Sequence, residues 1–231
     1  MIAVIPARGG SKGLPGKNIK EINGIPLIAY TIRAAKEASC IKRIIVTTDD
    51  EKIAATAQKY GAEVPFMRPE YLASDTSSAV DVYIHAAEYI MNEQNTEMNY
   101  FMVLLPTVPL RTGRHIEEAY QKFMKCEAKT LISVKEADVP PSWYLYRNSD
   151  DRILNCGFGL NRGFVSNRQM DQSYYVPNGA IYILDYKLLK EERTYYCDNT
   201  VPYVMDRKES VDIDTIDDFE YAEFLIKNRM L

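Results

Sequence analysis

The sequence predicts an α/β fold with a mostly parallel central sheet, and three observations lead to this class. Short apolar runs alternate with amphipathic runs of helical length along most of the chain. The first apolar run, residues 1–5, is too short for a helix and is closed by Pro6, as expected of a buried parallel strand. The 231 residues suffice for one α/β domain with a substantial core. We therefore expect a single domain whose ligands bind beyond the carboxyl ends of its strands.

The same alternation places each element along the chain. We expect strands at residues 1–5, 43–48, 62–66, 100–105, 130–134, 180–184 and 201–205. We expect helices at residues 26–38 and 51–60, from just after 76 to about 92, from about 113 to 125, and at 217–230. Residues 140–175 differ, because they are polar and weakly periodic. A stretch this long is seldom a bare loop, so we expect a small strand-containing extension that packs on a partner such as a second subunit.

Composition excludes several classes of protein. The net charge of −4 and the pI near 5.4 argue against general nucleic-acid binding, which needs an excess of basic residues on one surface. No apolar run approaches the roughly 20 residues that span a bilayer, and no signal peptide precedes the first strand. The four cysteines are far apart and only two histidines occur, which disfavours structural zinc. We expect a cytoplasmic protein with reduced thiols and no membrane partner.

The segment Arg8–Asn18, directly after the first strand, is suited to hold phosphates. Its four glycines allow backbone N–H groups to turn toward an anion, while Arg8, Lys12 and Lys17 supply positive charge. The pattern matches neither a Walker A loop nor G-x-G-x-x-G. A solvated basic turn without a ligand is the alternative interpretation.

Two further motifs carry chemistry. If residues 210–215 form a strand, alternation puts Asp212 and Asp214 on one face, where they could hold Mg²⁺ together with phosphate oxygens. The alternative is that Asp214 or Thr215 caps the final helix. Asn178 and Gly179 suit the special backbone angles of a turn that leads into a strand, although taken alone this motif favours a tight turn without a ligand. Arg68 and Arg111 could each reach an anion or a base edge, although surface arginines usually do neither.

Five motifs occur in order along nearly the whole chain. They are residues 5–18, Arg68–Glu70 with 72–76, Pro106–Thr107 with 109–113, Pro177–Tyr182, and Asp212–Thr215. Together they resemble the N-acylneuraminate cytidylyltransferase family, whose members make CMP-activated sialic acids and related nonulosonic acids. The resemblance implies a Rossmann-like nucleotidyltransferase fold, a single cytidylyltransferase domain over 1–231, and a dimerisation extension at 140–175.

The resemblance also implies roles for matching residues. The nucleotide-binding set is Ala7, Arg8, Gly9, Gly10, Ser11, Lys12, Lys17, Asn18 and Arg68, with Asn18 at the ribose and Arg68 at the cytosine. The sugar-binding set is Leu105, Thr107, Arg168, Gln169, Asn178 and Gly179, with Arg168 entering the neighbouring subunit's site. The catalytic set is Arg8, Lys17, Asp212 and Asp214, and the two aspartates carry Mg²⁺.

The implied reaction is transfer of CMP from CTP to the anomeric hydroxyl of a nine-carbon sugar acid by a homodimer, with release of pyrophosphate. Two rivals stay open: a nucleotidylyltransferase that joins another nucleoside triphosphate to a sugar phosphate, and a non-catalytic nucleotide- or sugar-binding protein.

Four departures from the family pattern concern the sugar. Leu105 replaces a glutamine, Ala79 aligns with a serine, Val176 replaces a frequent arginine, and Trp143 lies near the position of a lysine. Because a site that loses a polar group relaxes or inverts its preference for a hydroxyl, a deoxygenated sugar such as legionaminate is our hypothesis for the acceptor.

Overall fold

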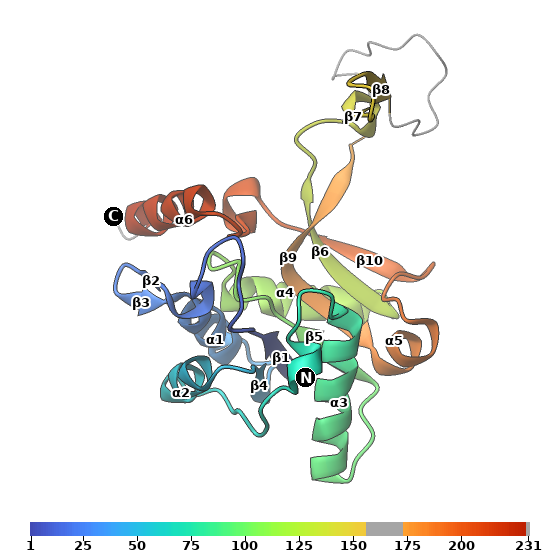
Figure 1. Ribbon diagram of the computed structural model, residues 1–231. Helices are drawn as coiled ribbons and strands as arrows, with labels where there is room; N and C mark the ends of the chain where they lie inside the picture. The colour runs from blue at the N-terminus through green and yellow to red at the C-terminus, as the bar shows by residue number, and fades with distance from the viewer. Residues whose placement is uncertain (156–172, 230–231) are drawn as a thin grey trace.

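The computed structural model describes residues 1–155 and 173–229, which are built around one six-stranded sheet (Figure 1). The strand order is β10-β6-β9-β5-β1-β4. Only β9 runs antiparallel to its neighbours, β5 and β6, while the other adjacent pairs are parallel. The strands are β1 Ile2–Pro6, β4 Arg43–Thr47, β5 Tyr100–Val103, β6 Thr130–Glu136, β9 Tyr175–Asp185 and β10 Thr200–Val204. The predicted α/β class with a mostly parallel sheet is confirmed.

Helices cover both faces of this sheet. They are α1 Leu27–Glu37, α2 Glu51–Lys59, α3 Ala79–Gln94, α4 Gly113–Lys125, α5 Tyr186–Glu192 and α6 Ile216–Arg229. Short 3₁₀ helices lie at η1 Lys17–Ile19, η2 Glu70–Leu72, η3 Pro141–Trp143 and η5 Arg207–Ser210. No helix in the described parts of the chain has the length and apolar character needed to cross a membrane.

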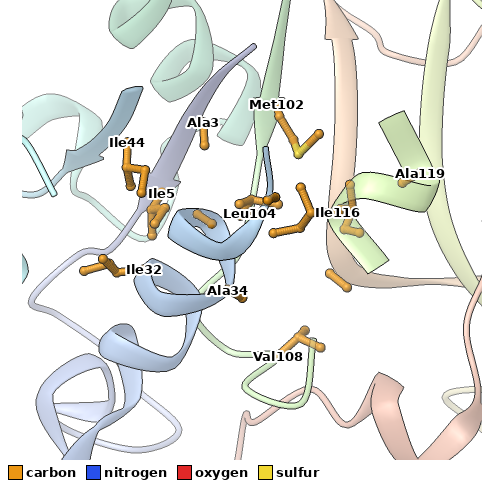
Figure 2. Packing of buried hydrophobic residues seen from close by; sticks show 14 of the residues in the cluster. Ala3, Ile5, Ile32, Ala34, Ile44, Met102, Leu104, Val108, Ile116 and Ala119 are labelled. Atoms are coloured by element: carbon orange, nitrogen blue, oxygen red, sulfur yellow. The ribbon is translucent and has the colours of Figure 1, made fainter. Parts of the chain in front are cut away.

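Alternation along the central strands divides the core into two layers. In β1, Ala3 and Ile5 pack with α1, α2 and α4, whereas Val4 packs on the other face with α3. Figure 2 shows the first layer, in which Ile32 of α1 and Ile116 of α4 lie beside the strand residues. Full burial of an isoleucine side chain stabilises the fold by about 1.5–3 kcal/mol relative to an exposed one. Burial in these two layers therefore fixes the order of the strands, and with it the sheet edge at which the loops lie.

Polar residues set where the helices begin. Asp50 caps α2 by accepting hydrogen bonds from two backbone N–H groups, and Ser78 caps α3. Thr112 and His115 form a reciprocal capping box at the start of α4. These caps fix the helix starts at the same sheet edge as the Gly-rich loop.

Three local expectations need correction. Residues 62–66 form no strand, but Glu63 makes an isolated bridge to Ile45 of β4. A small hairpin, β2 Glu21–Ile22 with β3 Ile25–Pro26, was not predicted, although its turn Asn23-Gly24 has the positive φ angles typical of that dipeptide. Helix α5 was also missed, because it follows β9 directly, with the last strand residue, Asp185, as its cap.

Beyond the sheet, β6 and β9 continue into a projecting extension (Figure 1). It contains an antiparallel hairpin of β7 Leu145–Arg147 and β8 Ile153–Asn155. Large apolar side chains are exposed on it, namely Trp143, Tyr144, Leu145, Tyr146 and Ile153. The extension thus has the expected strands and an apolar surface, while Arg168 and Gln169 lie outside the described residues.

Candidate active site

The basic loop and the segment after β5 meet because β1 and β5 are parallel neighbours, so their carboxyl ends share one sheet edge. They enclose a cleft of about 420 Å³. The cleft is lined by Pro6, Arg8, Ser11, Lys12, Gly13, Lys17, Asn18, Leu105, Pro106, Thr107 and Asp214. Eight of these eleven residues belong to the predicted site, from three separate motifs.

Backbone contacts hold the basic loop against its surroundings. Ala7 N–H donates to the Thr47 carbonyl at 3.0 Å, and Gly9 N–H donates to Asp49 Oδ1 at 3.0 Å. A Cβ at Gly13 would collide with the backbone oxygen of Asp214, so glycine permits the loop and the acidic segment to touch. Gly10, in contrast, faces open space.

Lys17 joins the two sides of the cleft. Its buried side chain donates to the Ile213 carbonyl and to Asp214 Oδ1, the latter at 3.0 Å. A lysine held in this way has less freedom to follow a triphosphate than an exposed one. Its geometry indicates a role in positioning Asp214, and the expected contact with phosphate stays a prediction.

Asn18 presents an unused acceptor to the cleft. Its Nδ2 donates to the Arg8 carbonyl at 2.9 Å, while its buried Oδ1 has no hydrogen-bond partner among the described residues. Buried acceptors are rarely left unpaired, so this oxygen is suited to receive a ligand hydroxyl.

The other two loop cations share one carboxylate. Arg8 Nη1 lies 3.1 Å from Asp75 Oδ1, and Lys12 Nζ lies 2.7 Å from Asp75 Oδ2. These cations hold the pKa of Asp75 below its usual range. Asp75 was named as part of a motif but not as a site residue, since sequence alone does not reveal its partners.

The acidic segment adopts a different structure from the one predicted. Residues 211–214 form no strand and run as an extended connection between η5 and α6. The two carboxylates influence each other through their charges: burial, followed by the charge of Asp214, raises the pKa of Asp212. Strand pairing is therefore not what places Asp212 and Asp214.

The pair fits a magnesium ion in its donor chemistry. Thr107 hydrogen-bonds to the Asp212 carboxylate, but Asp212 Oδ1 is buried without a hydrogen-bond partner in the described parts of the chain. Asp214 is mostly exposed and opens onto the cleft. One or two carboxylates combined with phosphate oxygens and water are the set that Mg²⁺ prefers.

The alternative role considered for Asp214 and Thr215 was that one of them caps the final helix, α6. The start of α6 is organised by Thr215 and Asp218: Asp218 accepts from the backbone N–H groups of Asp214 and Thr215 at 3.1 and 2.8 Å. Thr215 Oγ1 in turn accepts from the Asp218 N–H at 3.3 Å. The Asp214 carboxylate is accordingly not needed as a helix cap.

A buried network of neutral groups supports the acidic segment from below. Asn178 Oδ1 accepts from Ser133 Oγ at 2.6 Å and from Ala180 N–H at 3.1 Å, and its Nδ2 donates to Ser210 Oγ at 2.8 Å. All three side chains of this network are buried. The network fixes Ser210 two residues before Asp212, so the geometry gives Asn178 a positioning role. Its expected contact with a sugar stays a prediction.

Gly179 lies within β9, next to Asn178, and not in the turn predicted there. Its φ of +75° favours glycine, and an added Cβ would lie 3.1 Å from Leu105 Cδ1 and 3.4 Å from Asp212 Oδ2. Leu105 is half-buried, and it lies both next to Gly179 and on the wall of the cleft.

Both candidate arginines are buried rather than at the surface. Arg68 donates to the Thr47 hydroxyl at 3.2 Å and to the Thr47 carbonyl, and burial lowers the pKa of Arg68 to about 10. Arg111 donates to the carbonyls of Leu105 and Ala180 at 3.1 and 2.8 Å, and burial lowers its pKa to about 9. Arg111 therefore braces the cleft wall from behind, and neither arginine lines the cleft itself.

Sequence reasoning missed a group of tyrosines that packs at β9. Tyr182 of β9 packs edge-on against Tyr195 at 5.6 Å between ring centroids, and Tyr195 packs against Tyr196. Burial raises the pKa of Tyr182, and the charge of Asp212 adds to that effect. Nothing in the spacing of these residues predicts that they gather here.

Comparison with known proteins gives consistent relatives. The chain is 36% identical over 98% of its length to CMP-N,N'-diacetyllegionaminic acid synthase of Legionella pneumophila, covering 96% of that protein. It is 33% identical to pseudaminic acid cytidylyltransferase of Campylobacter jejuni, with 98% and 96% covered. A solved structure of CMP:2-keto-3-deoxy-manno-octonic acid synthetase complexed with CTP shares the fold, with a TM-score of 0.72 at 18% identity over 99% of this chain and 98% of that one.

The sequence profile described as "Cytidylyltransferase" matches residues 2–231. This match and the two relatives confirm the resemblance drawn from the five motifs. Since the profile spans nearly the whole chain and both relatives exceed 30% identity, the protein belongs to the cytidylyltransferase family.

Proposed function

We propose that this enzyme transfers CMP from CTP to the anomeric hydroxyl of a nonulosonic acid and releases pyrophosphate. One observation carries the proposal: the basic loop and Asp214 line one cleft, joined by the contact of Lys17 with Asp214 at 3.0 Å. Positive charge on one side suits a triphosphate, and carboxylates on the other suit the reacting α-phosphate and its metal. The relatives that act on legionaminic and pseudaminic acids support this choice of acceptor class.

The nucleotide would lie along the loop. Arg8 and Lys12 are exposed enough to bind phosphate oxygens, and Asn18 Oδ1 is free to accept from a ribose hydroxyl. Arg68 is buried behind the loop, and its charge interacts with that of Asp49. Any contact with cytosine would therefore be made at the inner end of the site.

Asp212 and Asp214 would hold Mg²⁺. The bound ion would neutralise charge on the α-phosphate and lower the pKa of the attacking hydroxyl. The chain's own contribution is to fix the two carboxylates through Thr107, Lys17 and the buried network at Ser210.

The acceptor would enter beside Leu105, Thr107 and Gly179. The apolar Leu105 side chain in this wall supports a deoxygenated sugar of the legionaminate type over one that presents a hydroxyl there. Arg168 and Gln169 remain proposed contributors from a second subunit, and the exposed apolar residues of the hairpin support such a homodimer. Among the described residues, Cys40, Cys126 and Cys197 are free thiols, which supports a reducing, cytoplasmic setting.

The test is pyrophosphate release by the purified protein with Mg²⁺. Each of CTP, UTP, GTP and ATP is combined with legionaminate, pseudaminate, N-acetylneuraminate, 3-deoxy-manno-octulosonate or a hexose 1-phosphate. We expect turnover with CTP and one nonulosonate, and with legionaminate above N-acetylneuraminate. Turnover with a sugar phosphate alone would contradict the proposal in favour of the first rival. Nucleotide binding without turnover for any acceptor would favour the second rival, a binding protein.

A further inference from the structure

Asp75 occupies the position between Arg8 and Lys12 that a phosphate group would take. Its two carboxylate oxygens are divided between the cations, at 3.1 Å from Arg8 and 2.7 Å from Lys12. Arg8 also donates to the Ser74 carbonyl at 3.3 Å. A carboxylate that accepts from two cations through two oxygens imitates the way in which a phosphate would be bound.

The loop that carries Asp75 is braced independently of these contacts. Ser77 Oγ donates to the Tyr71 carbonyl at 2.7 Å, and the hydroxyls of Ser74 and Ser77 lie 2.7 Å apart. Ser78 then caps α3. Asp75 is thus held near the cations by local structure, and it can lose them without unfolding the loop.

The contacts are also easy to exchange. The Lys12 side chain is 77% exposed and that of Asp75 is 43% exposed, so water and salt weaken the pair. A triphosphate or pyrophosphate carries several negative charges and would outcompete a single carboxylate for the same cations. The Asp75 carboxylate and a bound phosphate group cannot both pair fully with Arg8 and Lys12, because two negative charges held that close together repel each other.

We propose that Asp75 is an intramolecular competitor for these two cations, which yields them to the triphosphate of CTP and takes them back as pyrophosphate leaves. The inference rests on the proposed function. It gives Asp75 a role in the release of product rather than in binding of the nucleotide. The effect follows from mass action: a competitor attached to the protein is present at a high effective concentration and weakens retention of the anion.

The experiment measures binding of inorganic pyrophosphate and of CTP to the full-length protein by titration calorimetry, and the pyrophosphate off-rate by stopped flow. The variant Asp75→Asn keeps the shape but removes the competing charge. We expect its pyrophosphate Kd to fall by about two- to fivefold, the range for an exposed ion pair, with a slower off-rate.

Two comparisons make the result specific. Asp138→Asn removes the same charge from another exposed pair, 2.9 Å from Arg207, and should leave the Kd unchanged. In a Lys12→Ala background the gain from Asp75→Asn should shrink, because one of the contested cations is gone. Equal gains from Asp138→Asn and Asp75→Asn would overturn the inference, since they would indicate net charge alone.

The outcomes separate the inference from the function on which it rests. If wild type binds both anions and Asp75→Asn binds pyrophosphate no tighter, or more weakly, Asp75 merely orients Arg8 and the inference fails alone. If wild type binds neither CTP nor pyrophosphate, the proposed function fails and the inference with it. Thermal unfolding of Asp75→Asn at the wild-type temperature establishes that the variant is folded.

Discussion

The two sides of the cleft are built in opposite ways. On the acidic side, Asp212 is half-buried and rests on neutral, buried hydrogen bonds through Ser210 and Asn178. On the basic side, Arg8 and Lys12 are held by ion pairs to Asp75 at the surface. Buried neutral networks hold a single geometry, whereas exposed ion pairs exchange readily. We infer that Asp212 is held in one position while Arg8 and Lys12 adapt as anions enter and leave.

The largest effect should come from a substitution on the acidic side of the cleft. Asp212→Asn retains shape but removes the charge that would bind metal, so turnover should fall about 100-fold or more. Steady-state pyrophosphate release at saturating CTP and Mg²⁺ measures it. The matched control is Asp217→Asn, an exposed acid in the first turn of α6, which should retain nearly full activity. Near-wild-type turnover in Asp212→Asn would contradict the metal assignment.

The contact between the two sides can be broken at Gly13. In Gly13→Ala the added methyl collides with the backbone oxygen of Asp214, which forces the loop and the acidic segment apart. We expect a loss of about 1–3 kcal/mol in the free energy of unfolding, with weaker CTP binding. Chemical denaturation and titration with CTP measure both quantities. Gly10→Ala, whose methyl meets open space, serves as the control for the free energy of unfolding. If both variants unfold at the same denaturant concentration, the close approach at Gly13 does not hold.

The neutral network can be tested at Ser210. Ser210→Ala deprives Asn178 Nδ2 of its acceptor inside the fold, which should cost about 1–3 kcal/mol of stability. Because Ser210 lies two residues before Asp212, the half-saturating Mg²⁺ concentration should also rise, while the KM for CTP changes little. Ser39→Ala removes an exposed hydroxyl bonded to Glu117 and should change neither quantity. An equal rise in the CTP KM would argue for general damage instead of displaced carboxylates.

The smallest effect concerns stability and pH. Burial raises the pKa of Asp212, so in the folded state its ionisation is disfavoured. The resulting penalty is present above the raised pKa and vanishes below the ordinary value of 3.8, where the carboxyl is protonated in both states. Without metal, Asp212→Asn should therefore melt above wild type at neutral pH, with a gap that closes on acidification. Added Mg²⁺ should narrow the gap by stabilising wild type. A gap independent of pH would exclude the charge as its cause.

The sequence predicted the position of the cleft better than the contacts that hold its residues in place. The position of the basic loop followed from one short strand closed by Pro6, because local pattern and the parallel-sheet rule suffice to place such a loop. Asp212 and Asp214 were expected to share one face of a strand, but no strand forms at residues 211–214. Their true support, Asn178 with Ser210, joins residues 32 positions apart and leaves no periodic signal. The same holds for the loop that carries Asp75. Arg8 donates to the carbonyl of Ser74, the residue before Asp75, and the two are 66 positions apart in the sequence. Long-range polar pairing depends on the completed fold.

The most direct test of the contrast between the two sides is a crystal structure of the protein with CTP, compared with a crystal structure of the free protein. The account predicts that Arg8 and Lys12 contact the triphosphate and that the Asp75 carboxylate has left both of them. It also predicts that residues 211–214 and the hydrogen bonds of Asn178 are unchanged. A complex in which Asp75 keeps both cations while the 211–214 segment rearranges would contradict it.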